Sequence, residues 1–370
     1  MSIKKNLTRA KKFDKIFFMK IGIIGLPQAG KNTLFELLAG ISALDKNRPV
    51  IGEAPIGDER FDILARMYSP KKLTQAKIDI ALLPTIEGSI SQSGIIESIA
   101  NVDALLHVVR AFEDDSIYHL SGSINPRRDI ETVNSELILS DLIFIEKRLE
   151  RIEKSIKRKK DESLSKEREL LLKLKGHLEE ELPLRLLGLT DDEKSLVSGY
   201  PFLTLKEMLL ALNVLEGDLS KKELLSELKI SFAGLKIEMM QISAKVEAEV
   251  AGIESEQERE EFLKELGIEE KALEALTSLC IKALGLISFF TVGPNELRQW
   301  LIRRGISSVE AAGTIHTDLK RGFIRAEVIK YRDLVELGGE DQVKHAGKLY
   351  VKGKDYIVED GDIINVRFNV

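Results

Sequence analysis

The chain has 370 residues, of which 44% are hydrophobic and 31% are charged, and its formal net charge is −5. This length exceeds what one hydrophobic core usually supports, so we expect two or three folded domains. The acidic balance excludes a protein whose whole surface binds nucleic acid, although it leaves room for local basic patches.

The first 18 residues are rich in lysine and arginine, but charged side chains interrupt their apolar residues. These residues therefore contain no signal-peptide core. Met19 stands directly before the first predicted strand, so we interpret residues 1–18 as a disordered extension or a misassigned translation start. The alternative is a basic arm that binds RNA or anionic lipid.

Short apolar segments alternate with helical ones through the first 283 residues. Strands are predicted at residues 21–24, 78–83, 104–110, 208–214 and 238–243. Strands that alternate with helices form a mostly parallel sheet with helices on both faces, so the predicted fold class is α/β. His107 and Arg110 lie on the third of these strands, where we expect them to serve packing or the end of the sheet.

A heptad pattern interrupts this alternation between residues 141 and 199. Apolar residues repeat at intervals of three and four on either side of a polar turn: Leu142, Ile145, Leu149, Ile152 and Ile156, then Leu171, Leu174, Leu178 and Leu182. We predict an antiparallel helical hairpin inserted into a domain made of residues 19–140 and 200–283. Its basic tip, residues 157–160, is interpreted as a solvated surface; the alternative is a contact with RNA or an acidic partner.

Residues 284–370 form a further predicted domain of mixed α and β structure. Strands are expected around residues 289–292 and 323–331, and a helix is expected near residues 295–304. Two more short strands are expected between residues 349 and 370, separated by Glu359, Asp360 and Gly361.

The strongest functional motif lies between the first predicted strand and the following helix. Residues 25–33 read Gly-Leu-Pro-Gln-Ala-Gly-Lys-Asn-Thr, close to the phosphate-loop pattern of Gly, four residues, Gly, Lys, then Ser or Thr. Glycines let backbone N–H groups turn toward phosphates, and the helix start adds its dipole. The alternative, an ordinary glycine turn, is disfavoured by the flanking strand and helix. The motif predicts a protein that binds a nucleoside triphosphate.

Each position of this loop has a predicted role. Lys31 supplies a positive charge to the β and γ phosphates and is the candidate catalytic residue. The predicted phosphate-contacting residues are Gly25, Pro27, Gln28, Ala29, Gly30, Lys31, Asn32 and Thr33. Asn32 stands where a hydroxyl normally coordinates Mg²⁺, and an amide oxygen is a bulkier ligand for that ion. Asn32 and Asp79, which we place at the end of the second strand, are therefore the candidate metal ligands.

Several segments together resemble the YchF/Ola family, a branch of the Obg-related P-loop proteins. The segments that carry the resemblance are residues 25–35, 58–65, 79–81, 102–114, 213–216, 243–249, 312–318, 323–328 and 353–358. The resemblance implies a G-domain-like P-loop fold, the inserted helical domain, and a C-terminal ubiquitin-like β-grasp module called TGS. It also implies association with the ribosome or RNA.

The resemblance further implies how the base is bound. Asn213 and Glu216 occupy the place where GTPases keep Asn-Lys-x-Asp, and Ser243, Ala244 and Lys245 resemble the loop that backs the base. A glutamate is one methylene longer than the aspartate that pairs with guanine. The implied cofactors are therefore ATP or GTP, with Mg²⁺.

The departures from the family pattern gather where the γ-phosphate would lie. Residues 41–51 contain no threonine, although the family's first switch closes over Mg²⁺ with one. Leu82 replaces the glycine of the second switch, and the following stretch keeps only Gly88 and Gly94. Phosphoryl transfer needs metal, positioning and charge stabilisation together, so these losses predict slow or impaired hydrolysis.

Two functional hypotheses remain. The first is a slow P-loop ATPase or GTPase whose switches move the hairpin and TGS domain between ribosome-bound and free states. The second is a non-hydrolysing relative that acts as an interaction module for ribosome, RNA or protein. The lone Cys280 fits a reducing compartment, and no apolar run approaches the roughly 20 residues that span a bilayer. We expect a cytoplasmic monomer that does not bind membranes.

Overall fold

The computed structural model describes residues 19–42, 48–86, 95–114, 117, 119, 121–157, 161–268 and 271–369. These residues divide into two compact units. The larger unit contains residues 20–53 and 79–272, and the smaller unit contains residues 54–78 and 273–369. The predicted division placed residues 54–78 and 273–283 in the nucleotide-binding domain, whereas both segments belong to the smaller unit. It also treated residues 141–199 as a separate inserted domain, whereas they belong to the larger unit. Residues 1–18, which were predicted to be an extension, lie outside the described residues.

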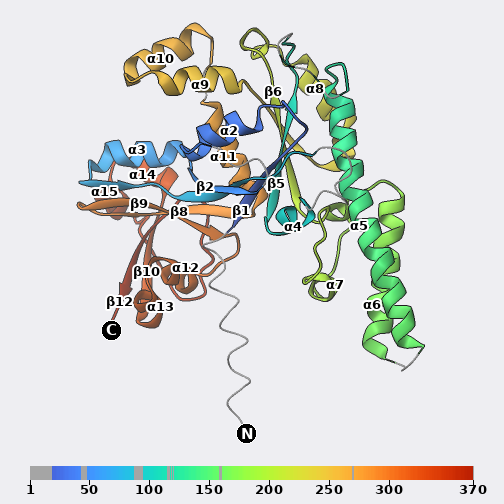
Figure 1. Cartoon of the computed structure of the whole chain (residues 1–370). Helices are drawn as coiled ribbons and strands as arrows, with labels where there is room; N and C mark the ends of the chain where they lie inside the picture. The colour runs from blue at the N-terminus through green and yellow to red at the C-terminus, as the bar shows by residue number, and fades with distance from the viewer. Residues whose placement is uncertain are drawn as a thin grey trace. The chain divides into compact units, whose positions relative to one another are not determined.

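The larger unit is built on a six-stranded sheet with the order β2-β4-β1-β5-β6-β7 (Figure 1). Its strands are β1 (Lys20–Ile24), β2 (Val50–Pro55), β4 (Lys77–Leu82), β5 (Ala104–Arg110), β6 (Glu207–Asn213) and β7 (Glu238–Ile242). The pairs β1–β4, β1–β5, β5–β6 and β6–β7 are parallel. The five predicted strands and the parallel α/β fold class are confirmed. The sequence did not predict β2, a half-exposed edge strand.

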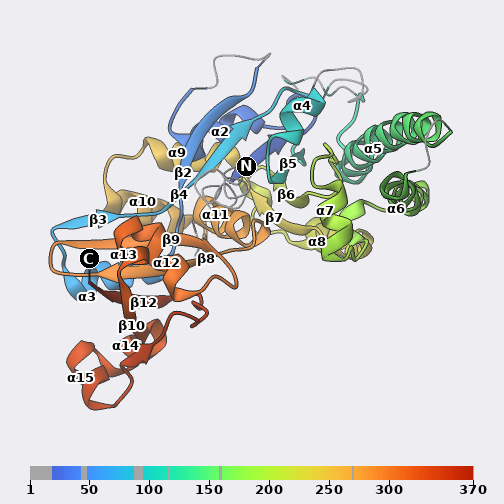
Figure 2. The same cartoon turned by 90° about the horizontal axis from the view of Figure 1, so that it is seen from below.

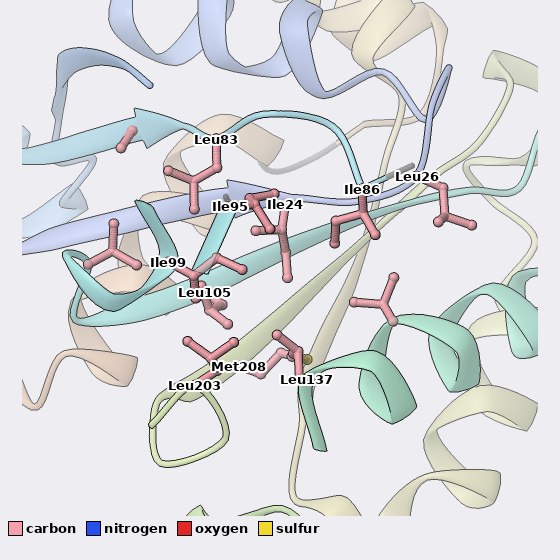
Figure 3. Packing of buried hydrophobic residues seen from close by; sticks show 13 residues of the cluster. Ile24, Leu26, Leu83, Ile86, Ile95, Ile99, Leu105, Leu137, Leu203 and Met208 are labelled. Carbon is pink, nitrogen blue, oxygen red and sulfur yellow. The ribbon is translucent and has the colours of Figure 1, made fainter. Parts of the chain in front are cut away.

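Helices connect and cover these strands. They are α2 (Lys31–Ala39), α4 (Ile95–Ala100), α8 (Glu223–Ser231), α9 (Ala244–Gly252) and α10 (Glu256–Glu265). All seven residues of β5 are buried, as expected for a central strand with helices on both faces. Side chains of Ile24, Leu105 and Met208 from the strands gather in one apolar cluster with Leu137 from the next helix, α5 (Figure 3).

Two long helices form the predicted hairpin, α5 (Pro126–Ile156) and α6 (Glu162–Glu179), followed by α7 (Asp191–Val197). The side chain of Asn125 accepts the N–H of Arg128 at the start of α5, and Pro126 occupies the first turn. The buried seam contains Ile145, Leu149, Ile152, Leu171, Leu174 and Leu178. The heptad pattern therefore marked the packed faces of both helices. Most of the basic tip lies outside the described residues, at 158–160.

The smaller unit contains a second sheet with the order β11-β10-β12-β8-β9-β3 (Figure 2). Its strands are β3 (Lys72–Thr74), β8 (Leu286–Val292), β9 (Glu296–Arg303), β10 (Phe323–Lys330), β11 (Tyr350–Lys352) and β12 (Asp362–Phe368). Its helices are α3 (Glu59–Tyr68), α11 (Ala272–Ala283), α12 (Ser308–Ile315), α13 (Thr317–Arg321), α14 (Tyr331–Leu337) and α15 (Glu340–His345). None of the helices in the described residues of either unit is long and apolar enough to span a membrane.

The predicted helix near residues 295–304 is wrong, because these residues form strand β9. Apolar residues lie on both faces of this strand: Leu297 packs in one core cluster, and Trp300 and Ile302 pack in another. A strand that is buried on both sides lacks the alternation of apolar and polar residues that is typical of half-buried strands. The spacing of its apolar residues can then match that of a helix. The antiparallel pairing of β9 with β8 decides between the two structures.

Residues 54–78 fold with the C-terminal sheet for identifiable reasons. Strand β3 pairs in parallel with β9, and Phe61 and Leu64 of α3 pack with Phe290. Arg60 donates to the carboxylates of both Asp58 and Asp360 and lies over the Phe290 ring, 5.6 Å from its centroid. These contacts join segments that are more than 200 residues apart in sequence.

Candidate functional site

The predicted phosphate loop connects β1 to α2 with unusual backbone angles. Gly25 and Gly30 have φ values of 148° and 94°. A Cβ atom at Gly25 would lie 2.4 Å from the Val108 carbonyl oxygen, and one at Gly30 would lie 2.3 Å from Asn213 Nδ2. Only glycine fits these two positions without a rearrangement. The glycines of the motif are therefore required by the packing of the loop against β5 and β6.

Lys31 is the first residue of α2 and is only 4% exposed. Its Nζ donates to the Gly25 carbonyl oxygen at 2.7 Å, which places the ammonium group inside the loop. The N-cap residue Gly30 provides no side-chain acceptor for the first-turn N–H groups. A buried cation beside an uncapped helix start is an arrangement that favours an anion such as phosphate.

Asn213 joins three of the predicted nucleotide-binding segments. Its Nδ2 donates to the Ala29 carbonyl oxygen at 3.0 Å, and its Oδ1 accepts the N–H of Ala244 at 3.0 Å. Ser243 caps α9 by accepting the N–H of Val246 at 3.4 Å. The structure therefore brings together the phosphate loop, the end of β6 and the loop after β7.

Glu216 and Lys245 both lie on these loops with exposed side chains. Glu216 begins a short 3-10 helix, η4 (Glu216–Asp218), directly after β6. Lys245 lies in the first turn of α9. Both loops follow the carboxyl ends of parallel strands, the edge at which α/β sheets bind ligands.

Asp79 does not lie at the phosphate loop, and the structure corrects its predicted role as a metal ligand. Asp79 is opposite Lys20 at the start of β1, whereas the loop begins after Ile24 at the other end of that strand. Four residues of strand correspond to ~13 Å. Burial raises the pKa of Asp79, and the charge of Lys20 opposes this effect. We predicted the correct strand for Asp79 but placed the residue at the end of that strand, whereas it lies near the start of β4.

Apolar residues occupy the part of β4 that is level with the loop. Leu82 pairs with Ile23, and both Leu82 and Leu83 are buried. The chain then passes the loop, where the Ile86 N–H donates to the Gly25 carbonyl oxygen at 3.5 Å. Gly88, Gly94 and residues 43–47 of the first-switch segment lie outside the described residues.

Among the residues that the structure describes, few side chains near the loop could bind a metal ion. Asn32 and Thr33 are exposed in the first turn of α2 and offer one amide and one hydroxyl oxygen. No group of three acidic, histidine or cysteine side chains that could hold a metal is found in the described parts of the chain. Mg²⁺ prefers a shell of oxygens that includes carboxylates or phosphates, so these residues do not form a magnesium site by themselves.

His107 is a site-adjacent residue that the sequence did not single out for function. It is 1% exposed, and burial, with the nearby Lys31 charge, lowers its pKa to about 3. It lines a small cavity beneath the loop together with Ala29, His119 and Asp129. Arg110 donates to the carbonyl oxygens of Phe112, Asp114 and Ile117, a structural role that agrees with expectation.

A second buried pair borders this cavity. His119 Nε2 lies 3.1 Å from Asp129 Oδ2, and its Nδ1 accepts the N–H of Ser121 at 3.1 Å. Since Nδ1 accepts, the proton lies on Nε2 and is donated to the carboxylate. Only the fold reveals this pair as a neighbour of the phosphate loop, because His119 lies in the segment between β5 and α5, and Asp129 lies in the first turn of α5.

Replacing Asp79 by alanine is expected to leave the affinity for ATP and GTP unchanged within about twofold, because the carboxylate lies far from the loop. Isothermal titration calorimetry in the presence of Mg²⁺ provides the measurement. A loss of tenfold or more, at unchanged melting temperature, would instead return Asp79 to the metal site.

Known proteins resemble this chain in sequence and in fold. The family model YchF-GTPase_C, described as a protein of unknown function (DUF933), matches residues 286–369. The ribosome-binding ATPase YchF of Bacillus subtilis is 40% identical over 94% of this chain and 99% of its own length. The protein of the same name in Escherichia coli O157:H7 is 39% identical over 95% of this chain and 99% of its own.

More distant relatives cover the chain equally well. Obg-like ATPase 1 of Oryza sativa subsp. japonica is 37% identical over 95% of this chain and 92% of its own length. The structure of the Schizosaccharomyces pombe YchF GTPase is similar, with a TM-score of 0.80, 28% identity, and coverage of 94% of this chain and 97% of that chain. From this similarity in sequence and fold, the chain belongs to the YchF family of P-loop proteins.

Proposed function

We propose that the protein binds a nucleoside triphosphate at residues 25–33 and hydrolyses it slowly. The observation that carries the proposal is the buried Lys31 ammonium, held inside the loop by the Gly25 carbonyl oxygen at 2.7 Å. A triphosphate at this position would meet that charge, the first-turn N–H groups and the positive end of the helix dipole. The exposed Asn32 and Thr33 are placed to contact it.

The base would lie over the loops that follow β6 and β7. Asn213 holds these two loops together and fixes them to the phosphate loop. We assign base recognition to the Glu216 carboxylate and to the backbone of Ser243, Ala244 and Lys245. The names of the relatives include both ATPase and GTPase, so both nucleotides belong in the test.

Slow turnover follows from what lies beside the loop. The side chains of Leu82 and Leu83 are buried and apolar. They therefore offer neither a hydrogen-bond donor nor a carboxylate at the place where a γ-phosphate would be positioned. A bound nucleotide would therefore bring Mg²⁺ largely on its own phosphate oxygens, which would supply charge neutralisation. The same apolar residues favour the second candidate function, a protein that binds nucleotide without hydrolysing it and acts through its other domains.

The experiment that separates the two candidates measures ATP and GTP affinity with and without Mg²⁺ and then multiple-turnover hydrolysis. We expect micromolar binding that falls less than about tenfold when EDTA removes Mg²⁺, and turnover well below the ~10 s⁻¹ typical of enzymes. Undetectable affinity for both nucleotides would refute the proposed binding. Binding without any turnover would leave the non-hydrolysing function.

We also propose that the partner is the ribosome. The bacterial relatives carry this property in their names and cover nearly all of this chain. We place the protein in the cytoplasm, as a monomer. Cosedimentation with ribosomes in a sucrose gradient, with and without ATP, tests the partner, and a protein that stays at the top of the gradient under both conditions contradicts it.

A further inference from the structure

Gln241 connects strand β7 to the loop after β6, one of the two loops to which we assign base binding. It lies on β7, one residue before the end of the strand, and its side chain is 9% exposed. Its Nε2 donates to the carbonyl oxygens of Asp218 at 2.6 Å and Lys221 at 3.1 Å. Both acceptors belong to the segment that begins with Glu216. One amide group therefore holds two points of the loop that follows β6.

The orientation of this amide is fixed by its partners. Two carbonyl oxygens can only accept, so the nitrogen of the amide must face them. The Oε1 atom is then left buried, with no hydrogen-bond partner among the described residues. An unpartnered buried oxygen lowers stability, and an apolar side chain of the same size would avoid that loss. Compared with an apolar side chain of the same size, glutamine at this position therefore gains only the two hydrogen bonds that it donates.

The bonds connect Gln241 to the nucleotide site through the backbone. In the parallel pairing of β6 with β7, Gln241 is opposite Leu212, and Ile242 is opposite Asn213. The N–H of Val214 donates to the Ile242 carbonyl oxygen at 2.9 Å, which continues the pairing toward Glu216. Beyond Gly217 the segment is also held by turn hydrogen bonds, by the half-buried Leu219, which packs against the apolar cluster of β6 and β7, and by an exposed ion pair of 2.7 Å between the Asp218 and Lys221 side chains. Exposed pairs of this kind constrain a loop weakly.

We propose that Gln241 is a positioning residue that sets the Glu216 carboxylate relative to the loop at Ser243–Lys245, and thereby sets the affinity for the nucleotide base. The inference rests on the proposed function, because it names a determinant of that same site. Neither of the two hydrogen bonds that Gln241 donates reaches the phosphate loop. Its effect is therefore expected on the base and not on the triphosphate.

The test compares three probes, ATP, GTP and inorganic tripolyphosphate, on the full chain by isothermal titration calorimetry. Gln241→Met removes the two donors at nearly constant volume, and Gln241→Glu places an acceptor against both carbonyl oxygens. We expect both variants to lose about tenfold in affinity for ATP and GTP, the glutamate more than the methionine, while tripolyphosphate changes less than about twofold. Met240→Leu, on the same strand, is the matched control and should change none of the three.

The outcomes separate this inference from the function on which it rests. Equal loss for tripolyphosphate and nucleotides, or a loss that tracks a lowered melting temperature, would show a role in folding and overturn the inference. Unchanged nucleotide affinity in Gln241→Glu would overturn it as well. A wild-type protein that binds ATP and GTP no more tightly than tripolyphosphate would also contradict it, because the base would then contribute no affinity. A wild-type protein that binds no probe contradicts the proposed function itself.

Discussion

Lys31→Ala is expected to lower the affinity for ATP on the order of 100-fold, or ~3 kcal/mol. The Nζ atom lies inside the loop, 2.7 Å from the Gly25 carbonyl oxygen, and the side chain is almost fully buried. Its charge would act on phosphate in a site partly closed to water, where charge-assisted hydrogen bonds are strongest. Isothermal titration calorimetry and multiple-turnover hydrolysis measure the loss.

The matched control is Lys229→Ala, which removes an exposed lysine from α8 in the same unit. It should leave nucleotide affinity unchanged and so exclude a general effect of net charge. Circular dichroism should show that Lys31→Ala is folded. An affinity for ATP within about twofold of the wild type would contradict the assignment of residues 25–33 as the phosphate site.

Asp141→Ala is expected to have the largest effect on stability, about 3–5 kcal/mol in the free energy of unfolding. Asp141 lies on α5 and is 1% exposed. Its carboxylate accepts the N–H groups of Leu203 and Thr204, each at 2.9 Å, and the Thr204 hydroxyl at 2.6 Å. Alanine would leave all three donors buried and unpaired, at the point where the hairpin joins the entry to β6.

Urea denaturation measures this loss, and Glu150→Ala provides the control on the same helix. Glu150 is exposed, so its removal should change stability by less than about 0.5 kcal/mol. Asp141→Asn keeps the volume and one acceptor oxygen and should lose less than alanine does. Equal stability of Asp141→Ala and the wild type would show that water replaces the carboxylate at no cost.

The same residue predicts a pH dependence. Burial raises the pKa of Asp141 to about 6, despite the hydrogen bonds that favour its charged form. The folded state therefore binds a proton more tightly than the unfolded state, so this contribution is fully present below pH ~4 and is lost as pH rises through about 6. The stability advantage of the wild type over Asp141→Asn should shrink across that interval, by an amount on the order of 3 kcal/mol. Urea denaturation at pH 4.5 and pH 7 checks the sign.

Sequence patterns were sufficient to predict the phosphate loop, the five main strands of the larger unit and the helical hairpin. These features depend on residues that are close in the chain: the glycines and Lys31 of one loop, or the heptad spacing of one helix pair. The family resemblance also pointed to Asn213, Ser243 and Ala244; in the structure Asn213 Oδ1 accepts the N–H of Ala244, and Ser243 caps α9. The spacing and type of neighbouring residues are sufficient to predict the loop, the strands and the hairpin, because each forms largely from a continuous stretch of chain.

The alignment of the strands and the contacts between distant segments became visible only in the folded chain. The register of β4 on β1 moved Asp79 away from the loop and placed Leu82 near it. The pairing of β3 with β9 placed residues 54–78 on the C-terminal sheet. The hydrogen bonds of Gln241 joined strand β7 to a loop 20 and 23 residues earlier in the chain. Strand register and long-range docking are set by the packing of whole faces and by loop closure, which no local pattern encodes.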